Sequence, residues 1–207
     1  MIIAVDGPAA SGKGTIARAL AQHYNLPHLD TGLLYRATGL SVLRHGGDPA
    51  NESDGVVATD FSDAMLHDPD IRCEAASRAA SVVSAHPSVR QALLDRQLAF
   101  ANQPGGAVLD GRDIGTVIAP DADAKLFVTA TAVIRAKRRF AQLVGEGSRV
   151  DYEHVLNDIL DRDERDSERA TAPLRQAGDA HLLDTSDMTI AEAIASAIQL
   201  VETHKIG

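Results

Sequence analysis

Residues 7–15 read GPAASGKGT, follow the apolar run at residues 2–5 and open a helical pattern. The glycine and lysine spacing matches a Walker A phosphate-binding loop, except that Gly14 separates Lys13 from the hydroxyl residue. Glycines let backbone N–H groups converge on phosphate oxygens, and a following helix directs its positive N-terminus at the same point. A chance glycine-rich turn is the alternative, which the preceding strand and following helix disfavour.

The loop predicts a binding site for the phosphates of ATP. Its expected contacts are Gly7, Pro8, Ala9, Ala10, Ser11, Gly12, Lys13, Gly14 and Thr15. Lys13 is expected to bridge the β and γ phosphates, and the Thr15 hydroxyl to help hold Mg²⁺. Such a loop identifies the phosphate donor but not the reaction, because switches, motors and kinases share it.

Composition favours a single globular domain over residues 1–207, since 44% of the residues are hydrophobic. The single cysteine cannot form an internal disulfide, and no apolar run approaches the roughly 20 residues that span a bilayer. A formal charge of −9 argues against a nucleic-acid coat, which needs a basic surface. We therefore expect a cytoplasmic monomer that binds neither membranes nor nucleic acids.

Short apolar runs alternate with helical patterns along the chain. The runs lie at residues 2–5, 107–109, 126–128 and 182–183. The helical patterns lie at residues 15–24, 81–102, 132–144, 152–169 and 189–204. Strands that are apolar on both faces indicate a parallel sheet covered on both sides. We expect an α/β P-loop NTPase fold of three layers, with helices on both faces of the sheet.

Two segments interrupt this pattern. Residues 45–70 are rich in Gly, Pro, Asp and Ser, which predicts a loop or a small excursion from the core. Residues 145–148 (GEGS) form a second flexible point between two helices that carry arginines. Glycines there are compatible with a closing flap or with a plain turn between helices.

Two further motifs follow apolar residues, DTGLLYR at residues 30–36 and DGRDIGTV at residues 110–117. The carboxyl ends of parallel strands border the ligand crevice, so both loops are expected to face the P-loop. Arg36 and Arg112 then place positive charge opposite the phosphate cradle. An ordinary surface ion pair is the alternative for either arginine alone.

A third motif, DRDERDSER at residues 161–169, has helical spacing. A helix places Arg162, Asp166 and Arg169 on one face at i, i+4 and i+7, and leaves Arg165 off that face. A solvated helix with salt bridges is the alternative, which is the usual structure of mixed-charge runs.

A basic cluster consists of Arg135, Lys137, Arg138 and Arg139, without the acidic neighbours of a simple salt-bridge pattern. We expect this cluster to contact the phosphates or the adenine of ATP. No Ser-His-Asp set or metal-ligand cluster emerges from the sequence. Phosphoryl transfer to a phosphate oxygen fits this composition, because that nucleophile is already ionised near neutral pH and requires alignment and charge neutralisation.

In this order, GPAASGKGT, LDTGLLYR, HPSVR, LDGRDIGTVI and RDERDSERATAPL resemble the motifs of bacterial cytidylate kinases over nearly the whole chain. The Gly-Lys-Gly-Thr ending is similar to that of nucleoside monophosphate kinases in general. The resemblance implies transfer of the ATP γ-phosphate to CMP and dCMP, giving CDP and dCDP. It also implies an acceptor-nucleotide-binding segment over about residues 37–90, and a lid with arginine helices over about residues 135–170.

The resemblance further implies roles for single residues. Those expected near the cytosine are Thr31, Arg90 and Asp113. Those expected at the sugar are Ser81, Arg162 and Asp166. Those expected at the acceptor phosphate are Arg36, Arg112 and Arg169, while Arg138 resembles the residue that covers the ATP base. The groups expected to neutralise the transferring phosphoryl group are Lys13, Arg112, Arg162 and Arg169.

Two departures from the family leave the ranking of CMP, dCMP and UMP open. Residues 45–70 are shorter than the inserted lobe of longer members, and Thr31 stands where some relatives have serine. Another small-molecule kinase, acting on a different nucleoside monophosphate or on shikimate, is the first alternative. A nucleotide-dependent switch is the second, although an Asn-Lys-x-Asp guanine signature is missing.

Overall fold

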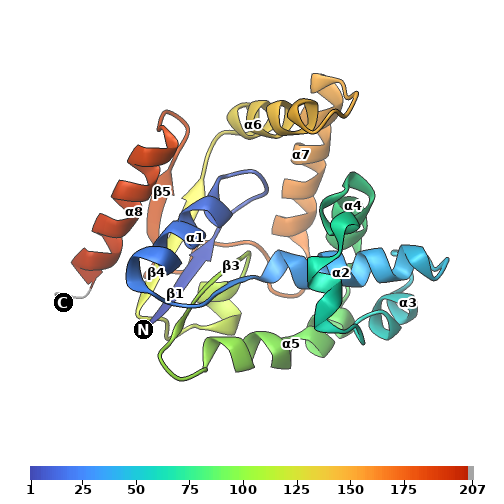
Figure 1. The fold of residues 1–207 in the computed structure, drawn as a ribbon, viewed down its shortest axis with the longest axis horizontal. Coiled ribbons are helices and arrows are strands. Elements are labelled where there is room, and N and C mark those ends of the chain that lie inside the picture. The colour runs from blue at the N-terminus through green and yellow to red at the C-terminus, as the bar shows by residue number, and fades with distance from the viewer. Residues whose placement is uncertain (205–207) are drawn as a thin grey trace.

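The computed structural model describes residues 1–204 and contains a five-stranded parallel sheet with helices on both faces (Figure 1). The strand order is β2-β3-β1-β4-β5. The strands are β1 (Ile2–Asp6), β2 (His28–Asp30), β3 (Ala107–Gly111), β4 (Ala124–Thr129) and β5 (His181–Asp184). The α/β class and the parallel sheet predicted from the sequence are confirmed.

Eight α-helices surround the sheet within the described residues, and 3₁₀ turns (Asp63–His67 and Pro69–Arg72) and one π-helical turn (Ile114–Ile118) add to them. The α-helices are α1 (Lys13–Tyr24), α2 (Thr31–Arg44), α3 (Glu52–Val57), α4 (Glu74–Val83), α5 (Pro87–Ala101), α6 (Ala132–Gly145), α7 (Tyr152–Glu168) and α8 (Ile190–His204). Among residues 1–204, none of the helices has the length and hydrophobicity needed to cross a membrane.

The central strand β1 is buried on both faces because its side chains alternate between two hydrophobic clusters. Ile3 and Val5 belong to the cluster that contains the buried faces of α1 and α8. Ala4 belongs to the cluster on the other face, with Leu109 and with residues of α5. The sheet therefore forms the middle layer, and α6 and α7 lie above the carboxyl ends of its strands (Figure 1).

Two predicted boundaries on the acceptor side are wrong. Strand β2 was not among the predicted apolar runs, because Leu29 is the only apolar residue of its three. The DTGLLYR motif at residues 30–36 is not a loop, since α2 begins at Thr31 and buries Leu34 and Tyr35. The predicted strand-end position is nevertheless correct, because Asp30 closes β2.

The predicted helix at residues 81–102 is two helices. α4 ends at Val83, and α5 begins at Pro87, where a missing N–H costs no helical hydrogen bond. Residues 45–70 form the expected excursion, which contains α3 and a 3₁₀ turn. The glycine-rich residues 145–148 form a turn between α6 and α7, in which Gly147 has a φ of 83°.

Helices α2 and α4 cross closely at Gly39. A Cβ atom at this position would lie 2.7 Å from the backbone nitrogen of Ala80 and 2.8 Å from the Cβ of Ala79. Backbone atoms of a packed helix cannot yield by side-chain rotation, so only glycine fits here. This crossing fixes α4 beside α2, and it thereby positions the arginines and serines that the two helices carry.

We predict that Gly39→Ala lowers the free energy of unfolding by about 1–3 kcal/mol, because the added methyl group overpacks the α2–α4 crossing. Urea denaturation followed by circular dichroism measures the change. Gly145→Ala is the matched control, since a Cβ there meets no atom within 4 Å. Equal denaturation midpoints for Gly39→Ala and the unsubstituted protein would contradict the assigned packing.

Candidate active site

The P-loop connects the end of β1 at Asp6 to the start of α1 at Lys13. Gly7 has a φ of 153°, and a Cβ atom there would lie 2.0 Å from the carbonyl oxygen of Val128. Gly12 has a φ of 92°, in the region that favours glycine. The two glycines therefore permit the tight passage from strand to helix that the sequence predicts.

Lys13 lies inside the loop, partly buried, and its Nζ donates to the carbonyl oxygen of Pro8 at 3.4 Å. Burial and the charge of Arg112 lower the pKa of Lys13 to about 7, against the opposing charges of Asp110 and Asp30. An anion bound in the loop would favour the charged ammonium. The position of Lys13 in the loop is therefore suited to binding a phosphate group.

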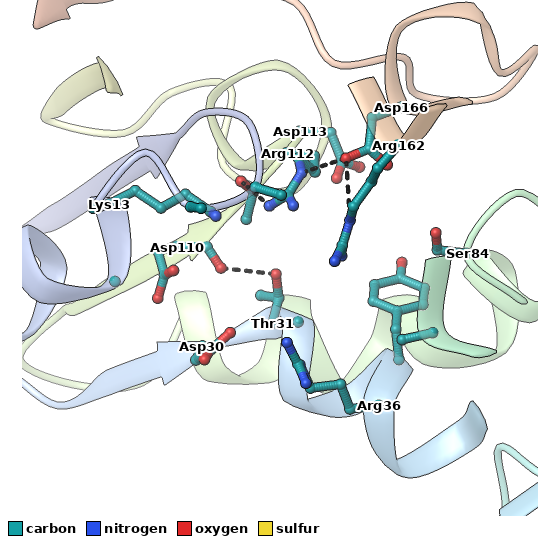
Figure 2. Close-up of a pocket in the computed structure, with 18 of the residues that line it drawn as sticks. Lys13, Asp30, Thr31, Arg36, Ser84, Asp110, Arg112, Asp113, Arg162 and Asp166 are labelled. Carbon is teal, nitrogen blue, oxygen red and sulfur yellow. Dashed lines mark hydrogen bonds and ion pairs between the residues drawn. The ribbon is translucent and has the colours of Figure 1, made fainter. Parts of the chain in front are cut away.

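A cavity of about 270 Å³ lies between the P-loop, α2, α7 and the residues that follow β3 (Figure 2). The expected site residues that line this acceptor-side cavity are Ala9, Ala10, Gly12, Lys13, Gly14, Thr15, Thr31, Arg36, Arg90, Arg112, Asp113, Arg162, Asp166 and Arg169. The fold thus brings together residues that are up to 160 positions apart in the sequence.

Arg112 is held by a buried carboxylate. Its Nε donates to Oδ2 of Asp166 at 2.7 Å, and Arg162 lies 3.9 Å from the same oxygen (Figure 2). Burial alone would lower the pKa of Arg112, but the charge and the hydrogen bond of Asp166, together with the charges of Asp110 and Asp30, raise that pKa. Burial likewise opposes ionisation of Asp166, and the arginines still lower its pKa. Asp166 therefore stays ionised and orients Arg112.

A second buried network lies beside α2. Arg90 forms an ion pair with Asp113 and donates to the carbonyl oxygen of Ser84 at 3.3 Å. Nη2 of Arg169 lies 3.6 Å from Asp113, and the Arg90 guanidinium lies 5.5 Å from the centre of the Tyr35 ring. Fixed donors and acceptors at one end of the cavity are suited to reading the edge of a base.

Positive charge is in excess around the cavity. Burial and the charge of Arg112 lower the pKa of Arg162 to about 9. Burial also lowers the pKa of Arg36, with Asp30 opposing. Nε of Arg162 and Nη2 of Arg169 are buried and make no hydrogen bond to residues 1–204. An anionic ligand would supply both the missing acceptors and the missing negative charge.

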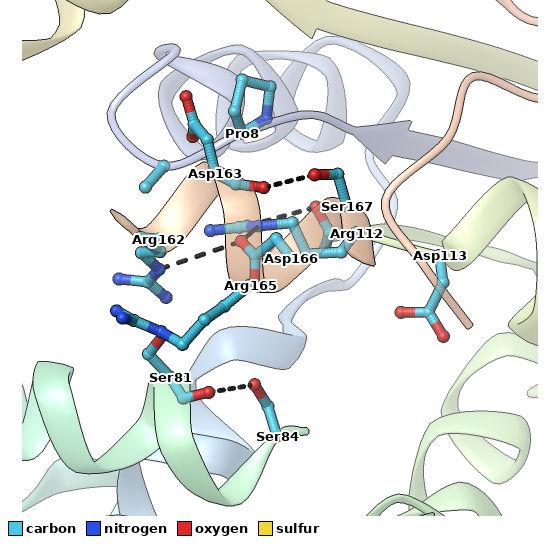
Figure 3. Close-up of polar contacts among 12 residues, drawn as sticks. Pro8, Ser81, Ser84, Arg112, Asp113, Arg162, Asp163, Arg165, Asp166 and Ser167 are labelled. Carbon is cyan, nitrogen blue, oxygen red and sulfur yellow. Dashed lines mark hydrogen bonds and ion pairs between the residues drawn. The ribbon is translucent and has the colours of Figure 1, made fainter. Parts of the chain in front are cut away.

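A neighbouring cavity of about 200 Å³ between α4, α6 and α7 contains Ser81. Nε of Arg165 donates to the Ser81 hydroxyl at 3.2 Å, and both Arg162 and Arg165 extend from α7 toward α4 (Figure 3). The prediction that Arg165 lies off the functional face is therefore wrong. Arg169 follows the end of α7 at Glu168, so its position in the acceptor-side cavity does not come from helical spacing.

A third cavity of about 620 Å³ lies on the other side of the P-loop, between α1, α6 and α8. It includes Arg138, whose guanidinium donates to the carbonyl oxygens of Thr185 at 2.6 Å and Ser11 at 3.4 Å. Ile190 and Met188 add an apolar wall. Ser11 lines this cavity, whereas Gly7 and Pro8 line none of the three.

The basic cluster on α6 is not free of acidic partners, contrary to the prediction. Arg135 is buried and binds both carboxylate oxygens of Asp163 on α7, at 2.9 and 2.5 Å. The partner lies 28 residues away, so no local charge pattern reveals it. Arg138 and Arg139 border the third cavity, whereas Arg135 borders none.

Three carboxylates were missed by the site prediction. Asp30 and Asp110, at the ends of β2 and β3, line the acceptor-side cavity beside Lys13 (Figure 2). Asp6 accepts hydrogen bonds from the backbone N–H groups of Ile114 and Gly115, both at 2.8 Å. For Asp6 and Asp110 the available signal was an acidic residue after an apolar run, and for Asp30 it was the acidic residue that opens the DTGLLYR motif.

The chain is similar to known proteins over nearly its whole length. The family model described as cytidylate kinase matches residues 3–203. A protein named cytidylate kinase from Xanthobacter autotrophicus is 59% identical over 208 residues and covers 100% of both chains. One from Methylocella silvestris is 55% identical over 98% of this chain and 94% of its own length.

Solved structures show a similar fold at low sequence identity. An uncharacterized protein from Eubacterium ventriosum has a TM-score of 0.57 at 17% identity, covering 98% of this chain and 99% of its own. A gluconokinase from Sinorhizobium meliloti has a TM-score of 0.51 at 15% identity, covering 99% and 95%. These two support the fold, and the full-length family match with the 59% identical relative shows that the chain belongs to the cytidylate kinase family.

Proposed function

We propose that the protein transfers the γ-phosphate of ATP to CMP and dCMP, giving CDP and dCDP. The observation that carries this proposal is the pair of cavities on the two sides of the P-loop. Ala10, Gly12 and Thr15 line both the acceptor-side cavity and the third cavity, so the two spaces meet at the phosphate-binding loop. A donor and an acceptor nucleotide bound in them would direct their phosphates at the same point.

On the donor side, the P-loop N–H groups and Lys13 would hold the phosphates, and Arg138 would cover the base of ATP. The residues present also fit Mg²⁺, because the Thr15 hydroxyl and the carboxylates of Asp30 and Asp110 are oxygen donors that line one cavity. When bound there, the ion would supply positive charge that stabilises the transferring phosphoryl group.

On the acceptor side, different residues are proposed to hold the phosphate, the sugar and the base of the nucleotide. The residues proposed to hold the phosphate are Arg36, Arg112 and Arg169. Those proposed at the sugar are Ser81, Arg162 and Asp166, and those at the base are Thr31, Arg90 and Asp113. The Thr31 hydroxyl donates to the carbonyl oxygen of Asp110 at 2.8 Å, so its oxygen is turned to accept from an amino group. A cytosine amino group meets that requirement.

The chemistry requires alignment rather than proton removal. A nucleoside monophosphate carries an ionised phosphate oxygen near neutral pH, which can attack directly. Lys13, Arg112, Arg162 and Arg169 would neutralise the charge of the transferring group in a partly buried space, where electrostatic interactions are stronger than in water. Asp166 contributes by holding Arg112 in place.

The division into an acceptor segment over about residues 37–90 and a lid over about residues 135–170 is part of this proposal. We also propose that the enzyme acts as a monomer in the cytoplasm. The supporting feature is that residues of one chain line the donor side and the acceptor side of the P-loop. Sedimentation of the free protein and of its complexes with CMP and ATP tests the monomer.

An acceptor panel tests the function directly. ADP release from ATP, coupled to a spectroscopic assay, is measured with CMP, dCMP, UMP, AMP, GMP and shikimate. We expect CMP and dCMP to give the highest kcat/KM, because the base-side network offers fixed partners. A preference for any other acceptor would mean that the proposed substrate is wrong. Slow ATP hydrolysis that no acceptor stimulates would indicate a nucleotide switch.

We predict that Arg36→Met lowers kcat/KM for CMP about 100-fold, or about 2.7 kcal/mol, because it removes a charge-assisted contact to the acceptor phosphate. The free energy of unfolding should change by less than about 1 kcal/mol, since the guanidinium is crowded by like charges in the free protein. Arg149→Met at an exposed position is the control. Nearly full activity of Arg36→Met would refute the assigned role.

Arg165 and Ser81 are predicted to act as a pair. Arg165→Ala and Ser81→Ala should each raise KM for CMP about fivefold, since one hydrogen bond contributes about 1 kcal/mol. The double variant should add little to either single change. Glu164→Ala, at an exposed position of the same helix, is the control. Additive effects would mean that the two side chains act separately.

A further inference from the structure

Arg135 differs from the other arginines of the site in what its guanidinium contacts. The side chain is 5% exposed and lies in the first turn of α6. Nε donates to the carbonyl oxygen of Ala130 at 2.8 Å, and Nη1 donates to that of Ala9 in the P-loop at 3.3 Å. Nη1 and Nη2 also bind the Asp163 carboxylate. Four donor contacts thus engage protein acceptors, and none of the three cavities includes Arg135.

The contact with Ala9 fixes the orientation of a P-loop peptide. In a planar trans peptide the C=O bond and the following N–H bond point in opposite directions. With its oxygen directed at α6, the Ala9 carbonyl leaves the N–H of Ala10 directed to the opposite side. Converging N–H groups of this kind are what binds phosphate in such a loop.

The same peptide leads into a strained residue. Ala10 has a φ of 58°, a left-handed conformation that residues with a Cβ rarely adopt. Such conformations persist where surrounding contacts hold them. Arg138, one turn after Arg135, similarly donates to the carbonyl oxygen of Ser11 at 3.4 Å, which Thr185 also contacts at 3.1 Å. Two arginines of α6 therefore hold alternate carbonyl groups of the loop.

We propose that Arg135, braced by Asp163, is a positioning residue that sets the peptide between Ala9 and Ala10 for the donor phosphates. The inference rests on the proposed function in that the P-loop binds ATP. It goes beyond that function by making donor affinity depend on the packing of α6 against α7. A purely structural ion pair would stabilise the two helices without favouring either nucleotide.

The test measures ATP and CMP binding separately, by isothermal titration calorimetry with one nucleotide at a time. Arg135→Met should weaken ATP binding about tenfold and change CMP binding less than twofold. Asp163→Asn should weaken ATP binding about threefold, because it keeps the contact of Arg135 with Ala9 and removes only the charged brace. Arg149→Met, exposed in the segment between α6 and α7 and outside all three cavities, is the control and should change neither.

Equal weakening of ATP and CMP binding, or unchanged ATP binding in Arg135→Met, would overturn the inference. If Arg135→Met fails to fold, the comparison of Asp163→Asn with Arg149→Met decides the question, since unchanged ATP binding in Asp163→Asn excludes the brace. Failure of the unsubstituted protein to bind ATP would instead refute the proposed function. The two failures are therefore distinguishable.

Discussion

The site depends on the parallel pairing of β1 with β3. The register places Val5 opposite Asp110 and Asp6 opposite Gly111, so the P-loop and residues 112–115 leave the sheet side by side. Asp6 strengthens this arrangement by accepting the N–H groups of Ile114 and Gly115. Burial raises the pKa of Asp6 to about 7, against the effect of those hydrogen bonds. The buried Asp6 carboxyl group, whose ionisation burial disfavours, is thus hydrogen-bonded to the segment that carries Arg112.

The negative charges that line the acceptor-side cavity come partly from residues at the carboxyl ends of the strands. Asp30 is the last residue of β2 and Asp110 the second-last of β3. Both partly offset the charge of Lys13, and Asp30 also offsets that of Arg36. Asp166 does the same for Arg112 from α7. The acids remain too few, since burial and neighbouring arginines still lower the pKa of Arg162 to about 9. A bound phosphate would reduce this repulsion, which couples ligand binding to the stability of the site.

The sequence predicted what depends on local spacing. The P-loop follows from contiguous residues, and four strands follow from apolar runs, whereas β2 has only Leu29 to mark it. Arg112 and Asp113 were placed by the rule that strand ends face the ligand. The pairs Arg135–Asp163 and Arg165–Ser81 join residues 28 and 84 positions apart. Those contacts depend on helix packing, which neither charge pattern nor periodicity specifies.

Helix α7 forms ion pairs with two neighbouring helices, α6 and α4. These two ion pairs differ in strength. Toward the P-loop it is held through Asp163 and the buried Arg135. Toward α4, Asp158 forms an ion pair of 3.0 Å with Arg78 between side chains that are 42% and 54% exposed. An exposed pair contributes little because water screens it, whereas a buried bidentate pair leaves an uncompensated charge when it breaks. The exposed ion pair between α7 and α4 therefore contributes less than the ion pair between α7 and α6.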